Sequence, residues 1–479
     1  MSKHDYNLVV IGGGSAGLIA ALIAATVRAR VTLVERDTMG GDCLNTGCVP
    51  SKTLIRSAKI AHYQRTGASY GLSDMVPQVN FPAVMQRVHD VIATIAPKDS
   101  MPRYRELGVD CIAGDAVLVD ANHVAVGATT LSTRSVVLAT GATPFVPPIP
   151  GLVEAEPLTS DNLWQLTSLP ERLLIMGGGP IGCELAQSFA RLGATVILID
   201  MESRLLPRED VDVSEFMADA FRAEGIDVRL GHRAVRVEAS PGGSGALHAE
   251  TADGVVAVEF DRILVAVGRR AHTQGLGLEK LGIATNPDGT LVVDRYLRTA
   301  CRNVFGCGDV VGPYQFTHIA SHQAWYASVN ALFGRLRKFK VDYSVVPWAT
   351  FTDPEIARVG ISEADARAQG VAVEVVRYDL EHLDRALTDG NARGWVKVLT
   401  RPGSDKILGV SIVGPHAGEL IAEYVLAMTH GLGLKAIMRT IHIYPTLAEA
   451  NKFAASAWRR EHAPEKLLDW VGRLHSWLR

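Results

Sequence analysis

The sequence predicts an α/β protein with two Rossmann-like dinucleotide-binding domains, and two observations carry this prediction. First, a glycine-rich turn joins a short apolar strand to a small-residue helix twice, at residues 12–17 and 177–182. Second, an acidic residue closes the next strand 23 positions after the first glycine in both places, at Glu35 and at Asp200. Glycine supplies 45 of the 479 residues, above the usual share of ~7%, as frequent tight turns require.

The first glycine turn has the spacing of a dinucleotide-binding loop. Gly12, Gly14 and Gly17 occupy the G-x-G-x-x-G positions, which permit a tight turn, close approach of the backbone to a pyrophosphate, and close packing of helix and strand. The pyrophosphate would lie at the helix N-terminus, and Glu35 would accept hydrogen bonds from a ribose diol. The elements of this unit are a strand at 6–11, a helix from 18 to about 28 and a strand at 31–35.

The second glycine turn repeats this pattern, with Gly177, Gly179 and Gly182 at the equivalent positions. A three-glycine pattern alone is weak evidence, so the repeated context carries the prediction. Two dinucleotide sites in one chain predict hydride transfer between two bound cofactors. The elements of the second unit are a strand at 172–176, a helix at 183–192 and a strand at 195–200.

Asp200 indicates which nicotinamide cofactor the second unit binds. A carboxylate at this position would repel a 2′-phosphate, which favours NAD over NADP. Arg204 and Arg208 follow within a few residues and would instead clamp that phosphate if they face it. We therefore expect NAD, with NADP as the alternative.

Composition and charge narrow the class of protein. Lysine and arginine number 48 against 51 acidic residues, so the formal net charge is only −3. This near-balance excludes a globally basic nucleic-acid-binding protein and a disordered acidic chain. No apolar run approaches the ~18 residues of a membrane span, and the N-terminus leads into a predicted strand without a signal peptide. We expect a cytoplasmic protein without a nucleic-acid partner or an integral membrane segment.

Only one pair of the six cysteines has a deliberate spacing, Cys43 and Cys48. On an ideal helix their Cα atoms would lie roughly 8–9 Å apart, beyond the ~7 Å limit for a disulfide. The segment is therefore predicted to be a loop or a distorted first turn, with Cys48 near a helix N-terminus that lowers the pKa of its thiol. A zinc site would need a second ligand pair, and none is present, so no metal is expected. The remaining cysteines are expected to be buried, inert thiols: Cys111, Cys183, Cys301 and Cys307.

Residues 40–52, GGDCLNTGCVPSK, resemble the redox-active segment of the flavin-dependent pyridine-nucleotide–disulfide oxidoreductases of class I, among them dihydrolipoamide dehydrogenase, glutathione reductase and mercuric reductase. The resemblance implies a glutathione-reductase-like fold with a C-terminal α+β dimerisation domain, FAD and NAD(P) as cofactors, and a homodimer. Further segments that resemble the family are residues 137–142, 266–269, 304–309 and 351–360.

The resemblance also implies roles for individual residues. Electrons would pass from or to NAD(P)H through FAD and a Cys43–Cys48 disulfide, with Cys48 next to the flavin and Cys43 attacking the acceptor. Lys52 would lie beside flavin N5, with Glu184 as its ion-pair partner. The expected FAD-binding residues are Gly12, Gly14, Gly17, Glu35, Gly41, Lys52, Ala116, Thr140, Gly141, Asp309, Thr317 and His318. The expected nicotinamide-binding residues are Gly177, Gly179, Gly182, Asp200 and Gly268.

The same resemblance divides the chain into four segments. These are an FAD-binding domain at 1–148, an NAD(P)-binding domain at 149–268, a second FAD or central segment at 269–342, and a dimerisation domain at 343–479. The last of these ends in an amphipathic helix at 464–479, which we expect to dock on the protein's own surface rather than on a membrane or a partner.

The chain departs from the family at the position of the thiol base. Disulfide-reducing members carry His-Pro-Thr-x-x-Glu, whereas this chain has Tyr444 before Pro445, Thr446 and Glu449. A phenol with a pKa near ~10 is a poorer proton shuttle at neutral pH than imidazole near ~6.5. If the chain is extended, His442 lies on the same side as Tyr444 and partly replaces the base; otherwise it satisfies local polar groups.

This departure leaves the acceptor open between a small-molecule disulfide, a quinone and a metal ion. Mercuric reductases resemble the chain in having tyrosine at this position, but they also carry a C-terminal cysteine pair. Here the last cysteine is Cys307, so this pair is missing, which argues against mercuric ion as the acceptor. A flavoprotein that senses redox state, rather than an enzyme, is the alternative from another class.

Overall fold

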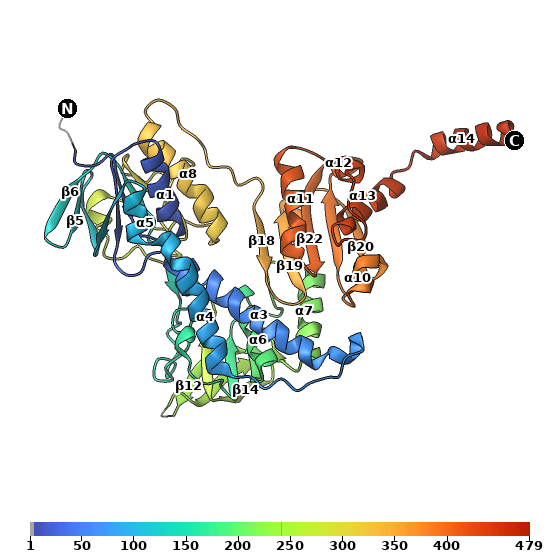
Figure 1. Cartoon of the computed structure of the whole chain (residues 1–479), viewed down its shortest axis with the longest axis horizontal. Helices are drawn as coiled ribbons and strands as arrows, with labels where there is room; N and C mark the ends of the chain where they lie inside the picture. Colours follow the sequence, from blue (N-terminus) through green and yellow to red (C-terminus); the bar gives the residue numbers. More distant parts are fainter. Residues whose placement is uncertain (1–3, 241) are drawn as a thin grey trace. The chain divides into compact units, whose positions relative to one another are not determined.

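The computed structural model describes residues 4–240 and 242–479, which form two compact units (Figure 1). One unit contains the chain up to Arg65, then Met75–Leu205 and Ala220–Asp342. The other contains Thr66–Asp74, Leu206–Asp219 and Tyr343–Arg479. In the part of the chain that the structure describes, no helix is long and apolar enough to cross a bilayer.

A five-stranded parallel sheet forms the centre of the first unit, with strand order β17-β7-β1-β2-β3. The strand β17 joins this sheet beside β7 although it comes far later in the chain, so residues after 300 complete the first nucleotide-binding unit. The strands are β1 (Leu8–Ile11), β2 (Val31–Glu35), β3 (Val109–Ala113), β7 (Val136–Leu138) and β17 (Val304–Gly306).

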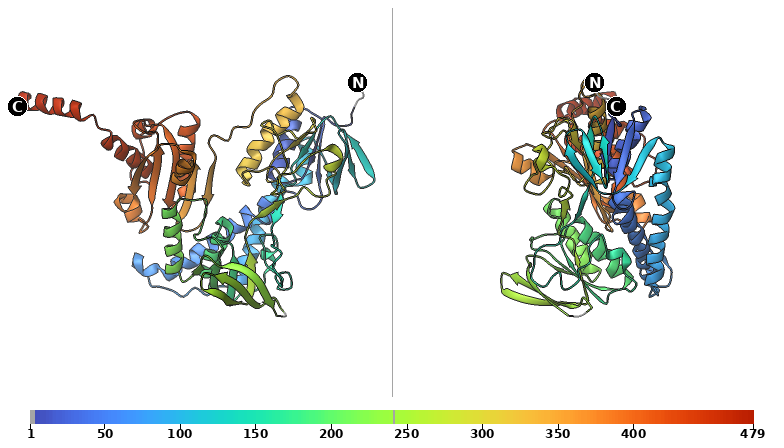
Figure 2. Two further views of the ribbon diagram at one scale, coloured as in Figure 1. Left: turned by 180° about the vertical axis from the view of Figure 1, so that it is seen from behind. Right: turned by 90° about the vertical axis from the view of Figure 1, so that its left-hand side faces the viewer.

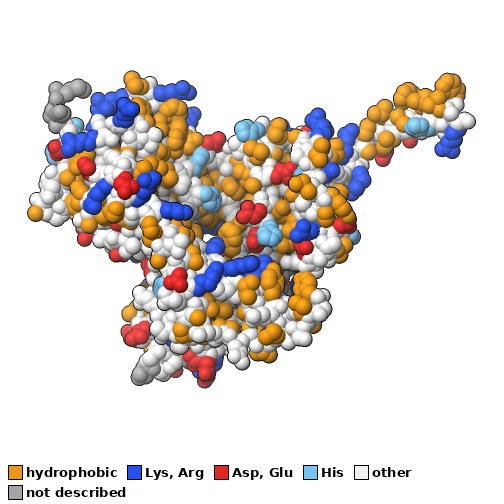
Figure 3. Space-filling model, in the orientation of Figure 1, with side chains coloured by type: hydrophobic (Ala, Val, Ile, Leu, Met, Phe, Trp, Pro, Cys, Tyr) orange, Lys and Arg blue, Asp and Glu red, His pale blue; other side chains and the backbone are white. Residues whose placement is uncertain are grey.

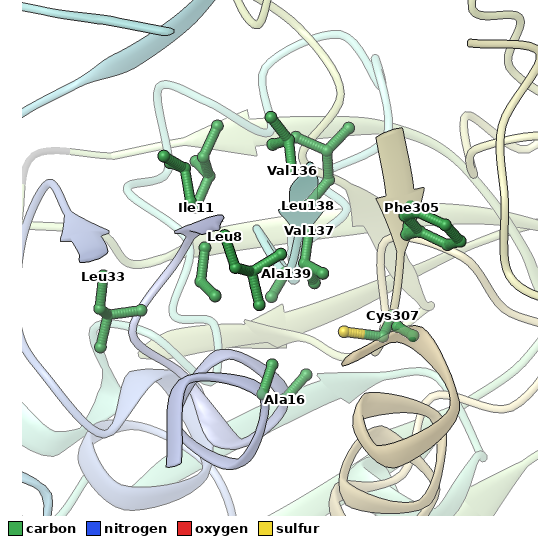
Figure 4. Close-up of a cluster of buried hydrophobic side chains, with 14 of the residues drawn as sticks. Leu8, Ile11, Ala16, Leu33, Val136, Val137, Leu138, Ala139, Phe305 and Cys307 are labelled. Carbon is green, nitrogen blue, oxygen red and sulfur yellow. The ribbon is translucent and has the colours of Figure 1, made fainter. Parts of the chain in front are cut away.

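The core of this sheet is made of aliphatic residues that are buried on both faces. Leu8, Leu33 and Leu138 are fully buried, and Phe305 and Cys307 pack in the same cluster (Figure 4). Such continuous apolar strands are typical of a parallel sheet covered by helices. Small residues let the covering helix α1 (Ser15–Thr26) approach α8 (Thr317–Phe333) closely; the buried alanines include Ala20, Ala24, Ala324 and Ala327.

A second parallel sheet, β11-β10-β9-β15, repeats the arrangement within the same unit. Its strands are β9 (Arg172–Met176), β10 (Thr195–Ile199), β11 (Asp227–Arg229) and β15 (Arg262–Val265), and its main helix is α6 (Pro180–Leu192). Three antiparallel strands lie between β11 and β15 in the sequence: β12 (Arg233–Ala239), β13 (Gly245–Thr251) and β14 (Gly254–Phe260).

Smaller elements complete the first unit. The helix α3 (Cys48–Arg65) packs against α4 (Phe81–Ile95) and α6. The remaining elements are α2 (Gly41–Asn45), α5 (Met101–Glu106), β4 (Ala116–Asp120), β5 (His123–Val126), β6 (Thr129–Ser132), β8 (Ala142–Pro144) and β16 (Arg269–Ala271).

The second unit is built on a five-stranded antiparallel sheet, β18-β19-β22-β21-β20, with helices packed on it (Figure 2). Its core includes the buried Tyr424 and Trp458. The strands are β18 (Pro347–Thr350), β19 (Glu355–Gly360), β20 (Glu374–Asp379), β21 (Trp395–Thr400) and β22 (Ile407–Gly414). The helices are α7 (Val211–Ala223, whose last residues belong to the first unit), α9 (Glu363–Gln369), α10 (Asp384–Thr388), α11 (Ala417–Thr429), α12 (Leu434–Arg439), α13 (Glu449–Glu461) and α14 (Glu465–Leu478).

The predicted fold class is confirmed, and the strands at 31–35 and 172–176 have the predicted bounds. Both glycine-turn helices begin three residues earlier than predicted, at Ser15 and Pro180, because the third glycine of each motif lies inside the helix. The C-terminal helix also forms as predicted, but no residue of α14 is buried. The expectation that it docks on the protein's own surface is therefore wrong for this structure.

Candidate active site

The first glycine turn has the backbone shape that a bound pyrophosphate requires. Gly12 has a φ of 106°, and a Cβ there would collide with the carbonyl oxygen of Ala139. A Cβ on Gly17 would collide with the carbonyl oxygen of Gly12. The helix α1 has Gly14 as its N-cap, without a side-chain hydrogen bond to its first turn. Its first N–H groups therefore lack a side-chain cap, as an anion site at a helix N-terminus requires.

The second glycine turn has the same geometry. Gly177 has a φ of 117°, and a Cβ on Gly182 would collide with the carbonyl oxygen of Gly177. Nothing lies within 4 Å of a Cβ added to Gly179, the N-cap of α6, which likewise makes no side-chain cap. These three glycines correspond one by one to the glycines of the first turn. The repeat predicted from the sequence is therefore also a repeat in the three-dimensional structure.

The two acidic residues that close the second strands lie against these turns. Glu35 accepts a hydrogen bond from the N–H of Gly13 at 2.5 Å and one from Asp37 at 2.8 Å. Asp200 accepts one from Gly178 at 2.5 Å and one from Glu202 at 2.8 Å. Each carboxylate is thereby fixed beside the turn where a ribose would follow the pyrophosphate. The residues present fit two bound dinucleotides.

The two redox cysteines lie on different helices, as the broken-helix prediction requires. Cys43 lies in the short α2, and Cys48 is the first residue of α3. Both are free thiols that share a hydrogen bond, and the Oγ1 of Thr317 lies 3.4 Å from the Sγ of Cys48. His318, the other residue expected beside the flavin, is exposed and stacks on Phe316 at 5.4 Å.

The electrostatic environment separates the roles of the two thiols. The hydrogen bond from Cys43 lowers the pKa of Cys48 to about 6, and the hydrogen bond to Thr317 and the charge of Lys52 act in the same direction. The same sulfur–sulfur hydrogen bond, together with burial, raises the pKa of Cys43. At neutral pH Cys48 is therefore a thiolate and Cys43 keeps its proton.

The predicted ion pair between Lys52 and Glu184 is present. The two side chains meet at 2.8 Å, and the Glu184 side chain is only 7% exposed. Lys52 lies one helical turn after Cys48 on α3, and Glu184 lies near the N-terminus of α6. The pair therefore ties the redox helix to the second glycine turn, and it holds a fixed positive charge beside the thiolate of Cys48.

A cluster that sequence reasoning missed surrounds Arg269. Its guanidinium forms an ion pair with Asp42 at 2.6 Å and lies 3.8 Å from Asp309. Burial raises the pKa of Asp309 to about 6. Asp42 directly precedes Cys43, so its place in the redox motif could have marked it as a residue of the site. Arg269 closes another quoted motif, but nothing in the sequence pairs it with a residue 227 positions earlier.

Trp164 was also missed. Its indole N–H donates to the carbonyl oxygen of Thr46 at 2.9 Å and to that of Ser160 at 2.7 Å, and the side chain is 4% exposed. Thr46 lies between the two cysteines, so this bond holds the turn that separates them. No pattern in the sequence links residues 118 positions apart.

Several other predicted residues lie at turns around the glycine motifs. Gly41 has a φ of 57°, and a Cβ there would come within 2.6 Å of the Cα of Gly14. Thr140 donates to the carbonyl oxygen of His272 at 2.7 Å. The remaining three are the left-handed Gly141 and Gly268 and the buried Ala116 at the start of β4. Of the four isolated cysteines, Cys301 differs from the prediction in being only half-buried.

In the second unit, Tyr444 and His442 point in different directions. Tyr444 is 67% exposed and donates its hydroxyl to Asp384 at 3.0 Å, which raises its pKa above 10. The His442 side chain is 5% exposed and lies 3.0 Å from both Glu423 and the carbonyl oxygen of Thr440. These contacts favour the interpretation in which His442 satisfies local polar groups over that of a substitute base. Glu449 is buried and accepts the N–H of Thr446 at 3.3 Å.

Two dinucleotide cradles with a polarised dithiol beside one of them define a class of redox protein: a dithiol oxidoreductase that takes electrons from a pyridine nucleotide. The comparisons agree with this class. Residues 6–324 match the family model of the pyridine nucleotide-disulphide oxidoreductases, and residues 346–455 match the dimerisation domain of the same family. The chain belongs to the pyridine nucleotide-disulphide oxidoreductase family, which is FAD-dependent and uses NAD(P)H.

Relatives with different substrates align over almost the whole chain. A mercuric reductase of Streptomyces lividans is 38% identical over 96% of this chain and 97% of its own length. A dihydrolipoyl dehydrogenase of Chlamydia muridarum is 34% identical over 93% of this chain and 95% of its own length. The protein is thus a flavin disulfide oxidoreductase, an enzyme, whose acceptor these relatives leave unresolved.

Solved structures give the same fold. The HOCl-induced flavoprotein disulfide reductase RclA from Escherichia coli matches with a TM-score of 0.84 and 30% identity, over 94% of this chain and 99% of its own. LpdA from Mycobacterium tuberculosis matches with a TM-score of 0.85 and 29% identity, over 94% and 99%.

Proposed function

We propose that this enzyme moves electron pairs from NADH through the Cys43–Cys48 dithiol to an acceptor that needs little proton transfer from the protein. The single observation that carries this proposal is the pair of free thiols in α2 and at the start of α3, where the Oγ1 of Thr317 lies 3.4 Å from the Sγ of Cys48; this environment lowers the pKa of Cys48 and raises that of Cys43. When bound, FAD would accept a hydride from the nicotinamide and pass the electron pair to the disulfide.

The residues around the dithiol support a division of labour. Lys52 and Thr317 stabilise the thiolate of Cys48, and Glu184 keeps Lys52 in place. Cys43 would attack the acceptor after losing its proton. FAD would be held by the backbone of the first glycine turn and by the side chains of Glu35 and Asp309. The nicotinamide cofactor would be held by the backbone of the second turn and by the side chain of Asp200.

The acceptor is the finer part of the proposal. Tyr444 stands where disulfide-reducing members have a histidine, and its raised pKa keeps it protonated, so it donates a hydrogen bond but accepts no thiol proton at neutral pH. This favours an acceptor such as a metal ion or a quinone over a disulfide. Thiolates bind soft metal ions and some relatives are named mercuric reductase, but this chain lacks the C-terminal cysteine pair of such reductases, so the acceptor screen covers quinones as well as metal ions.

An acceptor screen tests this assignment. Purified protein that carries FAD is mixed with NADH and, separately, with lipoamide or other small disulfides, quinones and divalent metal ions. We expect faster NADH oxidation with a metal ion or quinone than with any disulfide. Fast turnover of disulfides alone would contradict the acceptor assignment, and no steady turnover with any acceptor would favour the redox sensor.

The domain boundaries predicted from the sequence enter as part of the proposal. Residues 1–148 and 269–342 would together hold FAD, which the pairing of β17 with β7 supports. Residues 149–268 would bind the nicotinamide, and 343–479 would form the dimer interface. Six cysteines in 479 residues are too few for a disulfide-stapled secreted domain, which supports a cytoplasmic location.

Asp200 predicts a preference for NADH. We expect kcat/KM for NADH to exceed that for NADPH by at least about tenfold, the ratio given by about 1.4 kcal/mol of differential binding. The reason is repulsion between a 2′-phosphate and the carboxylate fixed by Gly178 and Glu202. Asp200→Ala should bring the ratio of the two kcat/KM values closer to one. A wild-type preference for NADPH, lost in Arg204→Ala or Arg208→Ala, would instead identify a phosphate clamp.

We also propose a homodimer in which Tyr444 and Glu449 complete the site of the other subunit. The supporting observation is a segment of exposed apolar residues next to Tyr444: Ile441 is 94% exposed and Ile443 is 78% exposed. A twofold dimer buries such self-complementary surface.

Ile443→Asp should therefore convert the dimer to monomers in light scattering at micromolar concentration and lower acceptor turnover at least tenfold, because a buried unpaired charge disfavours the interface. Val255→Asp adds the same charge at an exposed residue of β14 and should change neither the dimer nor acceptor turnover. A wild-type monomer that turns over would rule out the shared site.

A further inference from the structure

The C-terminal helix α14 carries an apolar surface that no part of its own unit covers. Leu467 is 53% exposed, Trp470 is 60%, Leu474 is 36% and Trp477 is 81%. Figure 3 shows hydrophobic side chains along this helix. Isolated amphipathic helices of this length are marginal in water, so α14 needs a surface to cover its apolar face.

The order of residues around the helix indicates which surface. At about 100° per residue, Trp470, Val471, Leu474, Trp477 and Leu478 fall with Leu467 within an arc of about 120°. Lys466 and Arg473 lie next to the tryptophan edge of this arc. Glu465 and Asp469 lie on the opposite side of the helix.

Tryptophans at the edge of an apolar arc, with basic residues beside them, are typical of helices that lie in the headgroup region of a bilayer. The acidic residues of α14 face away from the arc, where they would remain in water. The pattern therefore favours a lipid surface that carries negative charge.

An independent observation in the first unit points to the same ligand. After α8, the residues Arg335, Arg337, Lys338 and Lys340 follow one another within six positions, and all four are exposed. Arg295 joins them, because Arg295 and Lys338 lie 5.3 Å and 5.5 Å from the same Tyr296 ring. Among the described residues, none of these five forms an ion pair with a carboxylate, although the chain as a whole has a net charge of −3.

This basic patch is held rigidly and also exposes an apolar side chain. The buried Asn330 donates to the carbonyl oxygens of Tyr296 at 3.0 Å and of Phe339 at 2.8 Å, and so fixes the loop. Leu336, in the middle of the basic run, is 89% exposed. An aliphatic side chain among cations suits lipid headgroups and acyl chains.

We propose that the enzyme binds reversibly to anionic membrane surfaces through α14, which inserts among the headgroups; the basic patch belongs to the first unit and is a separate electrostatic contact. Stable attachment without a spanning helix takes two such signals. The proposal goes beyond the redox function and does not depend on the identity of the acceptor.

Vesicle sedimentation of the FAD-loaded, full-length enzyme tests the proposal. Vesicles of 70% phosphatidylcholine and 30% phosphatidylglycerol are compared with pure phosphatidylcholine at low and high salt. We expect binding to the anionic vesicles that weakens with salt and is at least about tenfold stronger than to the neutral ones, since each basic residue near the surface adds about 1 kcal/mol.

Matched variants assign the contacts. Leu474→Asn should lower vesicle binding at least about tenfold, because it removes from the arc a leucine that the bilayer would bury. Ser476→Asn, on the opposite face of the same helix, should bind as the wild type does. Arg337→Gln with Lys338→Gln should also lower binding about tenfold or more, whereas Lys280→Gln with Lys406→Gln, which removes the same charge from exposed positions elsewhere, should not. NADH oxidation with a water-soluble acceptor should be equal in all of them.

The same assays contain the results that would overturn the proposal. Equal binding to both vesicle types, or an unchanged Leu474→Asn, would refute a role of α14 at an anionic surface. The enzyme could bind neither vesicle type, while light scattering shows that Leu474→Asn converts the dimer to monomers. In that case α14 covers a second copy of the chain. Binding of an oligonucleotide in place of vesicles, lost with the basic patch, would identify a nucleic-acid surface instead.

Discussion

Replacing Cys48 with serine should remove the long-wavelength absorption that a thiolate beside oxidised flavin gives after two-electron reduction. It should also lower acceptor turnover by about 10³-fold or more, the scale on which enzymes lose a covalent residue. The structural reason is that Cys48, not Cys43, is the thiolate, with Thr317 and Lys52 beside it. The measurement is an anaerobic titration with NADH, followed by visible absorption.

The pH dependence of this band follows from the pKa of Cys48. Because the folded protein lowers that pKa to about 6, the thiolate is present above this pH and is lost as the pH falls through it. The band should therefore lose half its amplitude near pH 6. Cys43→Ser should keep a band, and Cys301→Ser, a half-buried cysteine outside the dithiol, should behave as wild type. A band that persists in Cys48→Ser would show that the two sulfurs are assigned the wrong way round.

The substitution Tyr444→His should raise turnover with dihydrolipoamide or small disulfides at least tenfold. A positioned acid–base group contributes about 10²–10⁴-fold, and Pro445, Thr446 and Glu449 are already present to orient an imidazole. Glu449 is buried next to the N–H of Thr446, as that orientation requires. Steady-state rates with each acceptor, measured for the FAD-loaded dimer, provide the comparison.

Two control variants separate the base from other effects. Tyr444→Phe removes the hydroxyl that Asp384 accepts but adds no imidazole, so disulfide turnover should not rise. His442→Ala should change the rates little, because both ring nitrogens of His442 already form hydrogen bonds, one with Glu423 and one with the carbonyl oxygen of Thr440. The tyrosine argument fails if the wild type already turns over dihydrolipoamide at hundreds per second, within the range of efficient enzymes, or if Tyr444→His changes no rate.

The parts of the fold that local sequence determines were predictable. Each glycine motif fixes a turn whose backbone excludes a Cβ at Gly12 or Gly177, and the repeat of its spacing in the same strand–turn–helix context located both nucleotide turns. The break between α2 and α3 followed from the reach of a disulfide. The pairing of Lys52 with Glu184 came from the family resemblance, because nothing local links residues 132 positions apart.

The parts that tertiary contacts determine were not predictable. Trp164 and Arg269 reach the redox segment only because separate strands and turns meet there. Alternation along an extended chain placed His442 beside Tyr444, but Glu423 draws the histidine side chain inward instead. The apolar face of α14 was correctly predicted, whereas its docking site was not, since amphipathicity shows that a face needs cover without showing what covers it.

The most direct test of the central claim counts thiols. The FAD-loaded enzyme, isolated in its oxidised form, is treated anaerobically with one equivalent of NADH per subunit, alkylated and analysed by mass spectrometry. The account predicts that Cys43 and Cys48 become alkylated together after NADH and remain protected without it, while Cys301 is unaffected by NADH. NADH consumption with no gain of thiols at Cys43 and Cys48 would contradict the account, because the electron pair would then remain on the flavin instead of reaching the dithiol.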